Sequence, residues 1–75
     1  KWNEKLHYAR IKKGFSQQET ATAVGITRAC YAHYEQGVRE PSLELLKKIC
    51  TVLDISVDYL LDDRLTNKYQ YKEPQ

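Results

Sequence analysis

Gln17 to Gly37, QQETATAVGITRACYAHYEQG, is the stretch of sequence that decides the fold. It predicts two short helices joined by a tight turn at Val24-Gly25-Ile26, because glycine ends a helix without a Cβ penalty. In the second helix, Tyr31 and Tyr34 have helical spacing and are expected to pack inward. The opposite side of that helix carries small and polar side chains. The sequence therefore predicts a short helix that exposes a face without large apolar residues.

Both helices have polar residues that can cap their N-termini. Ser16-Gln17-Gln18-Glu19 is a capping box: the Ser16 hydroxyl can accept from the Glu19 amide, and the Glu19 carboxylate can reach back to the Ser16 amide. Thr27 is expected to cap the second helix, which runs to Gln36. A lost cap typically costs about 1 kcal/mol, which is a large share of the stability of a small domain.

A first helix is predicted from Trp2 to Lys13. Its apolar stripe has helical spacing and consists of Trp2, Leu6 and Ala9, and the other faces of the helix are polar. Gly14 is expected to end this helix. Phe15 lies just before the capping box and is expected to pack against the next helix.

Two further helices are predicted after a loop at Val38–Pro41, because proline disfavours helical geometry in the residue before it. Ser42 is expected to cap the first of them, which ends at Asp54. Its core stripe is predicted to be Leu43, Leu46, Ile49, Cys50 and Leu53. Ser56 is expected to cap the second, from Val57 to Leu61. The residues expected to close the core there are Tyr59, Leu60 and Leu61.

The periodic pattern stops after Leu61. Residues 1–61 are therefore predicted to form one all-α domain of five helices. Residues 62–75 are predicted to be an irregular tail that serves as a linker or a dimer contact. The chain begins at Lys1 and contains no methionine, so its native start is expected to be missing or processed.

Composition narrows the classes of function. The formal net charge is +2, but residues 1–39 carry seven basic against three acidic residues, and residues 40–75 carry five against seven. This excess of positive charge near the predicted exposed helix suits a polyanionic partner. No apolar run approaches the roughly 18 residues of a membrane span, and we expect a cytoplasmic protein. Paired carboxylates, a nucleophile with a base, and a phosphate loop are all missing from the sequence, so an enzyme is not predicted.

Cys30 and Cys50 are expected to be reduced thiols. They do not have the spacing of a zinc site and no paired histidines accompany them, so no metal and no cofactor are predicted. A disulfide between them is the less favoured alternative, because each is expected on a separate helix.

The chain resembles the phage-repressor/Cro-like helix-turn-helix family, the Xre-type transcriptional regulators of bacteria and phages. The matching pieces, in chain order, are Leu6 with Arg10, Gly14-Phe15-Ser16-Gln17 with Ala21, Gly25-Ile26-Thr27 with Tyr31, Tyr34-Glu35-Gln36-Gly37, Pro41-Ser42 with Leu46 and Ile49, and Ser56-Val57-Asp58-Tyr59-Leu60. The match covers about residues 5 to 61 in unbroken order. It implies a five-helix, lambda-repressor-like domain with Thr27 to Gln36 as the recognition helix in the major groove.

The resemblance also implies a set of DNA-contacting residues: Gln17, Thr27, Arg28, Ala29, Ala32, His33, Gln36 and Arg39. Gln17, Gln36 and Arg39 are expected at phosphates, and Thr27 at the sugar-phosphate backbone. Arg28 is the leading base reader, because a guanidinium group fits the O6/N7 edge of guanine. The two alanines would meet a thymine methyl group, and the histidine would accept or donate at a base edge.

Arg10 and Glu35 occupy positions that form a structural ion pair in many members of the family, and the same role is expected here. Three positions depart from the family pattern. Ala9 and Thr20 are smaller than usual and reduce core volume, which Trp2 or Phe15 is expected to fill. Cys30 replaces a commoner serine or threonine, which weakens any phosphate contact from that position.

The function implied is sequence-specific binding of a double-stranded DNA operator by a transcriptional regulator, acting as a repressor and as a homodimer. Two alternatives stay open. One is an antitoxin-like autoregulator that also binds a toxin, and the other is a protein-interaction module on the same fold. Acidic or bulky residues on the predicted recognition face would favour the interaction module, and Arg28, Ala29 and His33 argue against it.

Overall fold

The computed structural model describes residues 1–61 and contains no strand within them. Four helices follow one another: α1 (Trp2–Lys13), α2 (Gln17–Val24), α3 (Arg28–Gln36) and α4 (Leu43–Leu53). The chain is helical again at residues 57–61. These bounds confirm the predicted all-α fold and its five helices. The predicted tail, residues 62–75, lies outside the described residues.

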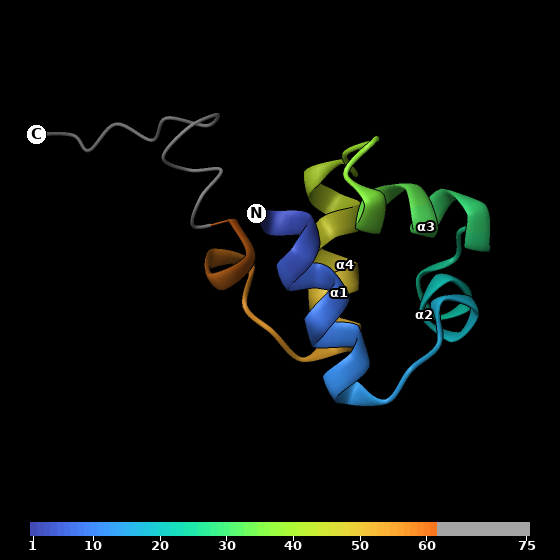
Figure 1. Ribbon diagram of the computed structural model, residues 1–75, viewed down its shortest axis with the longest axis horizontal. Helices are drawn as coiled ribbons and strands as arrows, with labels where there is room; N and C mark the ends of the chain where they lie inside the picture. Colours follow the sequence, from blue (N-terminus) through green and yellow to red (C-terminus); the bar gives the residue numbers. More distant parts are fainter. Residues whose placement is uncertain (62–75) are drawn as a thin grey trace, which may run out of the picture.

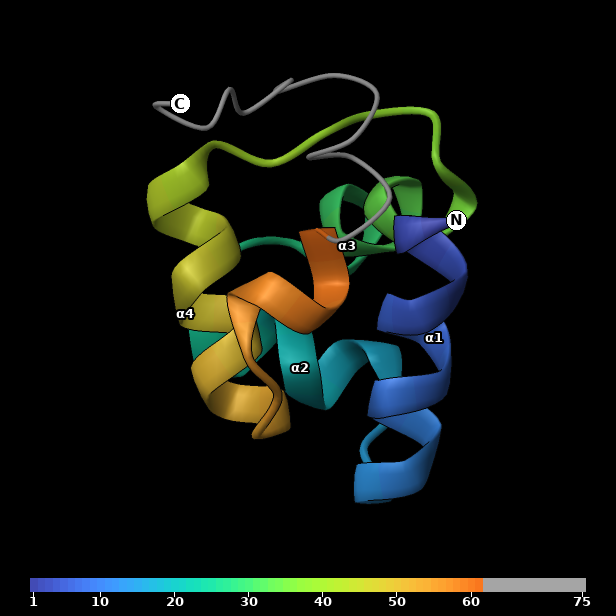
Figure 2. The ribbon, with the colours of Figure 1, turned by 90° about the vertical axis from the view of Figure 1, so that its left-hand side faces the viewer.

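The helices pack around one core. α2 packs against α3 and α4, and α1 packs against α3 and, less extensively, against α4. Figure 1 shows α2 and α3 on one side of α1, and the helical residues 57–61 on the other. Figure 2, turned by 90°, shows residues 57–61 in front of α2 and α3. The turn between α2 and α3 is thus held on the side of the molecule opposite to the last helical segment.

Local capping explains where the helices begin and end. The Glu19 amide donates to Ser16 Oγ at 2.9 Å and the Ser16 amide to Glu19 Oε1 at 2.8 Å, so the predicted capping box is formed. Thr27 Oγ1 accepts from the Cys30 amide at 3.1 Å at the start of α3. Gly25 ends α2 with φ +82°. This is a left-handed backbone conformation that residues other than glycine adopt only with strain.

The core contains most of the residues predicted for it. The buried hydrophobic residues are Trp2, Leu6, Ala21, Val24, Tyr31, Tyr34, Leu46, Ile49, Cys50, Leu53, Leu60 and Leu61. Thr20 is fully buried, and its hydroxyl donates to the Ser16 carbonyl at 3.0 Å, so its polar group is satisfied. Phe15 is half-buried against this core.

Two residues predicted for the core are exposed. Leu43, expected in the stripe of α4, is 54% exposed, and Tyr59, expected to close the core, is 51% exposed. Leu43 is the first residue of α4. Figure 2 shows the first turn of α4 at the edge of the molecule, beyond the helices on which the rest of α4 packs. Tyr59 instead lies along the surface, with the ammonium group of Lys5 5.0 Å from the centre of its ring.

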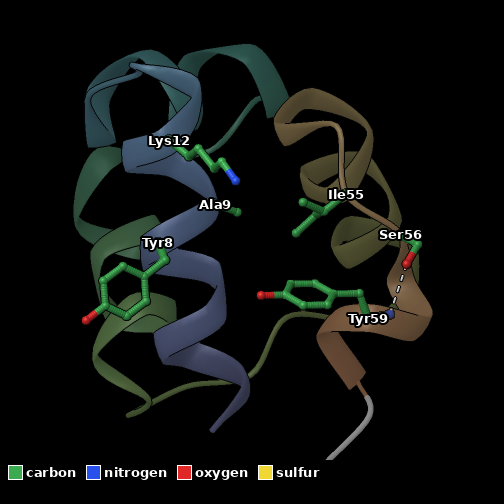
Figure 3. A pocket seen from close by; sticks show the side chains of 6 residues that line it. All are labelled: Tyr8, Ala9, Lys12, Ile55, Ser56 and Tyr59. Carbon is green, nitrogen blue, oxygen red and sulfur yellow. Dashed lines mark hydrogen bonds between the residues drawn. The ribbon is translucent and has the colours of Figure 1, made fainter.

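The small side chain of Ala9 packs against the edge of the core and also borders a groove. The groove has a volume of about 410 Å³ and lies between α1 and residues 55–59. Its lining residues are Tyr8, Ala9, Lys12, Ile55, Ser56 and Tyr59. Figure 3 shows the Tyr59 ring and the Lys12 side chain extending into it and the Tyr8 ring pointing away from it.

Candidate nucleic-acid interface

α3 has two faces of opposite character. Its inner face buries Tyr31, Tyr34 and Glu35. Its outer face is made of small side chains and hydrogen-bond donors: Arg28, Ala29 and Gln36, which are exposed, and Ala32 and His33, which are half-buried. No carboxylate lies on this outer face, so nothing on it repels a polyanion. The five residues expected from sequence to face DNA from this helix are therefore brought together on one surface.

A buried carboxylate holds this helix in place. Glu35 is 8% exposed and accepts hydrogen bonds from Arg10, at 2.6 Å from Nε and 3.2 Å from Nη2. The Tyr31 hydroxyl donates to the same carboxylate at 2.7 Å. Gln17 Nε2 donates at 3.1 Å, and His7 Nδ1 lies 3.0 Å away. Because these donors come from α1, α2 and α3, the one carboxylate fixes the positions of three helices.

The network shifts the pKa values of its members. Burial alone would raise the pKa of Glu35, but hydrogen bonds from Arg10, Tyr31, His7 and Gln17 outweigh burial and lower that pKa to about 2. Burial, reinforced by the nearby carboxylate, raises the pKa of Tyr31. The hydrogen bond to Glu35 raises the pKa of Arg10, against the effect of burial. The carboxylate is therefore charged, and the phenol is a proton donor, at neutral pH.

Gln17 serves this network with its side chain. It is the first residue of α2, and its half-buried amide points inward to Glu35. The family resemblance implies a phosphate contact from this residue. The groups that remain for such a contact are the backbone N–H groups of Gln17 and Gln18, because the Glu19 amide is bound to Ser16 Oγ. The inward hydrogen bond was missed because residues 17 and 35 lie far apart in the sequence.

His7 is a further member of the network, and it is not among the residues predicted from the sequence. Its side chain is 46% exposed, and it lies on α1 three residues before Arg10. Arg10 also donates from Nη1 to the Phe15 carbonyl at 2.8 Å. The i, i+3 spacing to Arg10 was the available signal, because residues three apart share one face of a helix.

The other expected contact residues lie around α3. Thr27 is exposed and uses its hydroxyl to cap α3, while Arg39 is exposed in the loop that follows α3. Cys30 is half-buried, and its thiol donates to the Tyr34 hydroxyl at 3.3 Å. Cys50 is buried in α4, and burial raises its pKa to about 11. Both cysteines are free, and residues 1–61 contain no cluster of side chains that could hold a metal ion.

α2 and α3, joined by the turn at Gly25, define a helix-turn-helix domain whose second helix exposes its outer face. The chain belongs to the helix-turn-helix family, whose model matches residues 6–60. It is 45% identical over 60 residues to the SPbeta prophage-derived uncharacterized HTH-type transcriptional regulator YonR of Bacillus subtilis, covering 80% of this chain and 56% of the relative. It is 42% identical over 67 residues to the uncharacterized HTH-type transcriptional regulator YqaE of the same organism, covering 89% of this chain and 58% of the relative.

A third relative comes from another organism. The chain is 27% identical over 66 residues to the cryptic phage CTXphi transcriptional repressor RstR of Vibrio cholerae, covering 88% of this chain and 60% of the relative. The chain thus spans little more than half the length of these relatives. No solved structure matches it. Within the described residues, none of the helices has the length and apolar character needed to cross a membrane.

Proposed function

We propose that this chain is the sequence-specific DNA-binding domain of a transcriptional regulator. The observation that carries the proposal is the outer face of α3, which combines small side chains with hydrogen-bond donors and contains no carboxylate. Small side chains let a helix approach base edges closely, and donors match the acceptor-rich edges of purines. The buried Glu35 network supports the proposal, because a rigidly held helix keeps its reading residues in register with the bases.

In this arrangement Arg28 is the principal base reader. It is the first residue of α3, the end of a recognition helix that faces base edges in this class of domain. Ala29 and Ala32 offer methyl groups to thymine. Gln36 and Arg39 hold phosphates beyond the C-terminal end of the helix, and Thr27 contacts the backbone at its N-terminal end.

The regulator is proposed to act as a homodimer and as a repressor in the bacterial cytoplasm. α3 has nine residues, so one copy contacts few base pairs. Two copies on a near-palindromic operator, with half-sites about one helical turn apart, would double that contact. The repressor assignment is supported by the relative whose name describes it as a transcriptional repressor.

A salt series tests the DNA-binding function. Affinity is measured for duplexes selected from a random pool and for the unselected pool, between about 50 and 200 mM salt. We expect a steep fall in affinity with salt for both and a preference of roughly a thousandfold or more for the selected duplexes. Equal affinity for both pools, or no binding at low salt, would refute the proposal.

A pair of arginine variants tests the residue roles. Arg28→Ala should weaken binding to the selected duplex by about 1 to 3 kcal/mol and relax preference at one base pair. Arg39→Ala should weaken binding to all duplexes alike and lower the salt slope by about one. Lys12→Ala is the matched control, because it also removes one positive charge but lies in the groove on the far side of α1 from α3. If both arginine variants had the same effect, the division between base reading and phosphate contact would be wrong.

A further inference from the structure

The two ring nitrogens of His33 have different surroundings. His33 lies on the outer face of α3, one turn after Ala29, and is half-buried. Its Nδ1 atom is buried and has no hydrogen-bond partner within residues 1–61. Its Nε2 atom makes no hydrogen bond either, but it is not buried. The ring therefore offers one nitrogen to an approaching molecule and hides the other.

This difference determines which nitrogen carries the proton of the neutral ring. A proton on Nδ1 would be a buried N–H donor without an acceptor, a group that is rare in folded proteins. A proton on Nε2 leaves only a bare lone pair in the buried position and places the N–H at the surface. The surroundings of the two nitrogens therefore favour the Nε2–H form.

We propose, resting on the DNA-binding function above, that His33 reads the major groove as a hydrogen-bond donor only. Its Nε2–H would pair with a base that presents an acceptor there: N7 or O6 of guanine, N7 of adenine, or O4 of thymine. Cytosine presents its N4 amino group in the major groove, so two donors would meet and this base is rejected at the contacted position. His33 thereby becomes a specificity-determining residue of the interface.

The rest of the outer face strengthens this selection. Ala29 and Ala32 have no polar side-chain atoms, and Arg28 has only donors. Because Nδ1 of His33 is buried, Gln36 supplies the only exposed side-chain acceptor among the residues of α3 that form this face. α3 therefore offers donors and methyl groups, and the half-site is expected to present acceptors and thymine methyl groups to it.

The form of the ring can be measured on the free protein. Long-range proton–nitrogen NMR correlations of the ¹⁵N-labelled chain, recorded at about pH 8 where an ordinary histidine is neutral, identify the protonated nitrogen. We expect the Nε2–H form for His33. A dominant Nδ1–H form would overturn it, whatever the chain does with DNA.

The base contact is tested by replacing single acceptors in the selected duplex. 7-Deazapurines remove N7, 6-thioguanine weakens O6 and 4-thiothymine weakens O4, one position at a time. Wild-type protein should lose roughly threefold to tenfold in affinity at one position, as expected for one hydrogen bond. His33→Phe should be insensitive at that position, whereas His33→Gln, which keeps a side-chain N–H donor, should retain sensitivity. Tyr8→Phe is the control: it also replaces a polar aromatic side chain with phenylalanine, but on α1, and should behave as wild type.

The outcomes separate this inference from the proposed function. If wild type prefers the selected duplex and His33→Phe gives the same profile of base replacements, the reading role of His33 is wrong and the DNA-binding function stands. If wild type has no preference for any duplex, both are wrong. Thermal unfolding of each variant shows whether it is folded. If His33→Phe does not fold, His33→Gln, which keeps a side-chain N–H donor, is compared with wild type instead.

Discussion

Replacing Glu35 with glutamine should cost about half the stability of the domain. The change keeps the size of the side chain and removes the negative charge, which leaves the Arg10 guanidinium, 8% exposed, without its counter-ion. Breaking a buried ion pair by removing one partner costs about 3 to 5 kcal/mol. Glutamine still offers an oxygen to Tyr31, so the lower end of that range applies. A small domain has roughly 5 kcal/mol or little more in total.

The pKa of the carboxylate gives an independent value for the same loss. The pKa of Glu35 is about 2 in the folded protein and about 4.3 in an unfolded chain. That difference corresponds to about 3 kcal/mol of stability at neutral pH. Because the folded pKa is the lower one, this stability is present above about pH 4.3 and is lost as the pH falls toward 2.

Urea unfolding followed by circular dichroism, repeated from pH 7 down to about pH 2, measures both quantities. Glu35→Gln should be about 3 kcal/mol less stable at pH 7, with a midpoint of thermal unfolding roughly 15 °C lower. Its stability should also fall less than that of wild type between about pH 4.3 and pH 2. If the variant is too unstable to study, Tyr31→Phe, which removes one hydrogen bond to the charged carboxylate, should cost about 1.5 to 3 kcal/mol.

The matched control is Glu44→Gln, a change of the same chemistry at an exposed position in the first turn of α4. Glu44→Gln should lower the free energy of unfolding by less than about 1 kcal/mol. If Glu35→Gln were as mild as this control and kept the wild-type pH profile, the carboxylate would not be the element that joins the three helices.

Three other changes follow from the structure. Ser16→Ala should lower the free energy of unfolding by about 1 kcal/mol, because Ser16 caps α2 and receives the Glu19 amide; urea unfolding measures it, and a loss near zero would contradict the cap. Gly25→Ala should lower the free energy of unfolding by about 1 kcal/mol, because φ is +82° at this position. An added Cβ would meet nothing within 4 Å, so the cost comes from backbone strain alone. A stabilised variant would show that the turn is not left-handed. Cys50 should react with iodoacetamide far more slowly than Cys30, because Cys50 is buried and its pKa is raised to about 11; mass spectrometry of the alkylated chain would reveal equal rates if this were wrong.

The bounds of the helices could be predicted from sequence because their signals are local. Ser16 and Glu19 mark the start of α2 within four residues, and Gly25 marks its end. Leu43 and Tyr59 were misplaced for the opposite reason. Their periodic positions are correct, but periodicity along one helix does not say where that helix extends past its neighbours or which surface its side chains lie along.

The candidate site divides in the same way. The outer face of α3 follows from the spacing of Tyr31 and Tyr34 alone, because burying those two side chains turns the opposite face outward. The resemblance implies the Arg10–Glu35 pair, but the rest of the Glu35 network is not predicted from the sequence. His7 and Gln17 reach Glu35 from other helices, 28 and 18 residues away in the sequence, and only the folded chain brings them together.

The two faces of α3 make stability and recognition separable by experiment. Glu35 faces inward, and its loss would move α2 and α1 relative to α3, so a change there should reduce affinity for DNA and stability together. Arg28 and Gln36, on the outer face, have no side-chain hydrogen bond within residues 1–61. Surface changes of this kind usually alter stability by less than about 0.5 kcal/mol. A loss of affinity at these positions therefore measures contact with DNA, whereas a loss of affinity at Glu35 must first be corrected for the fraction of protein that is unfolded.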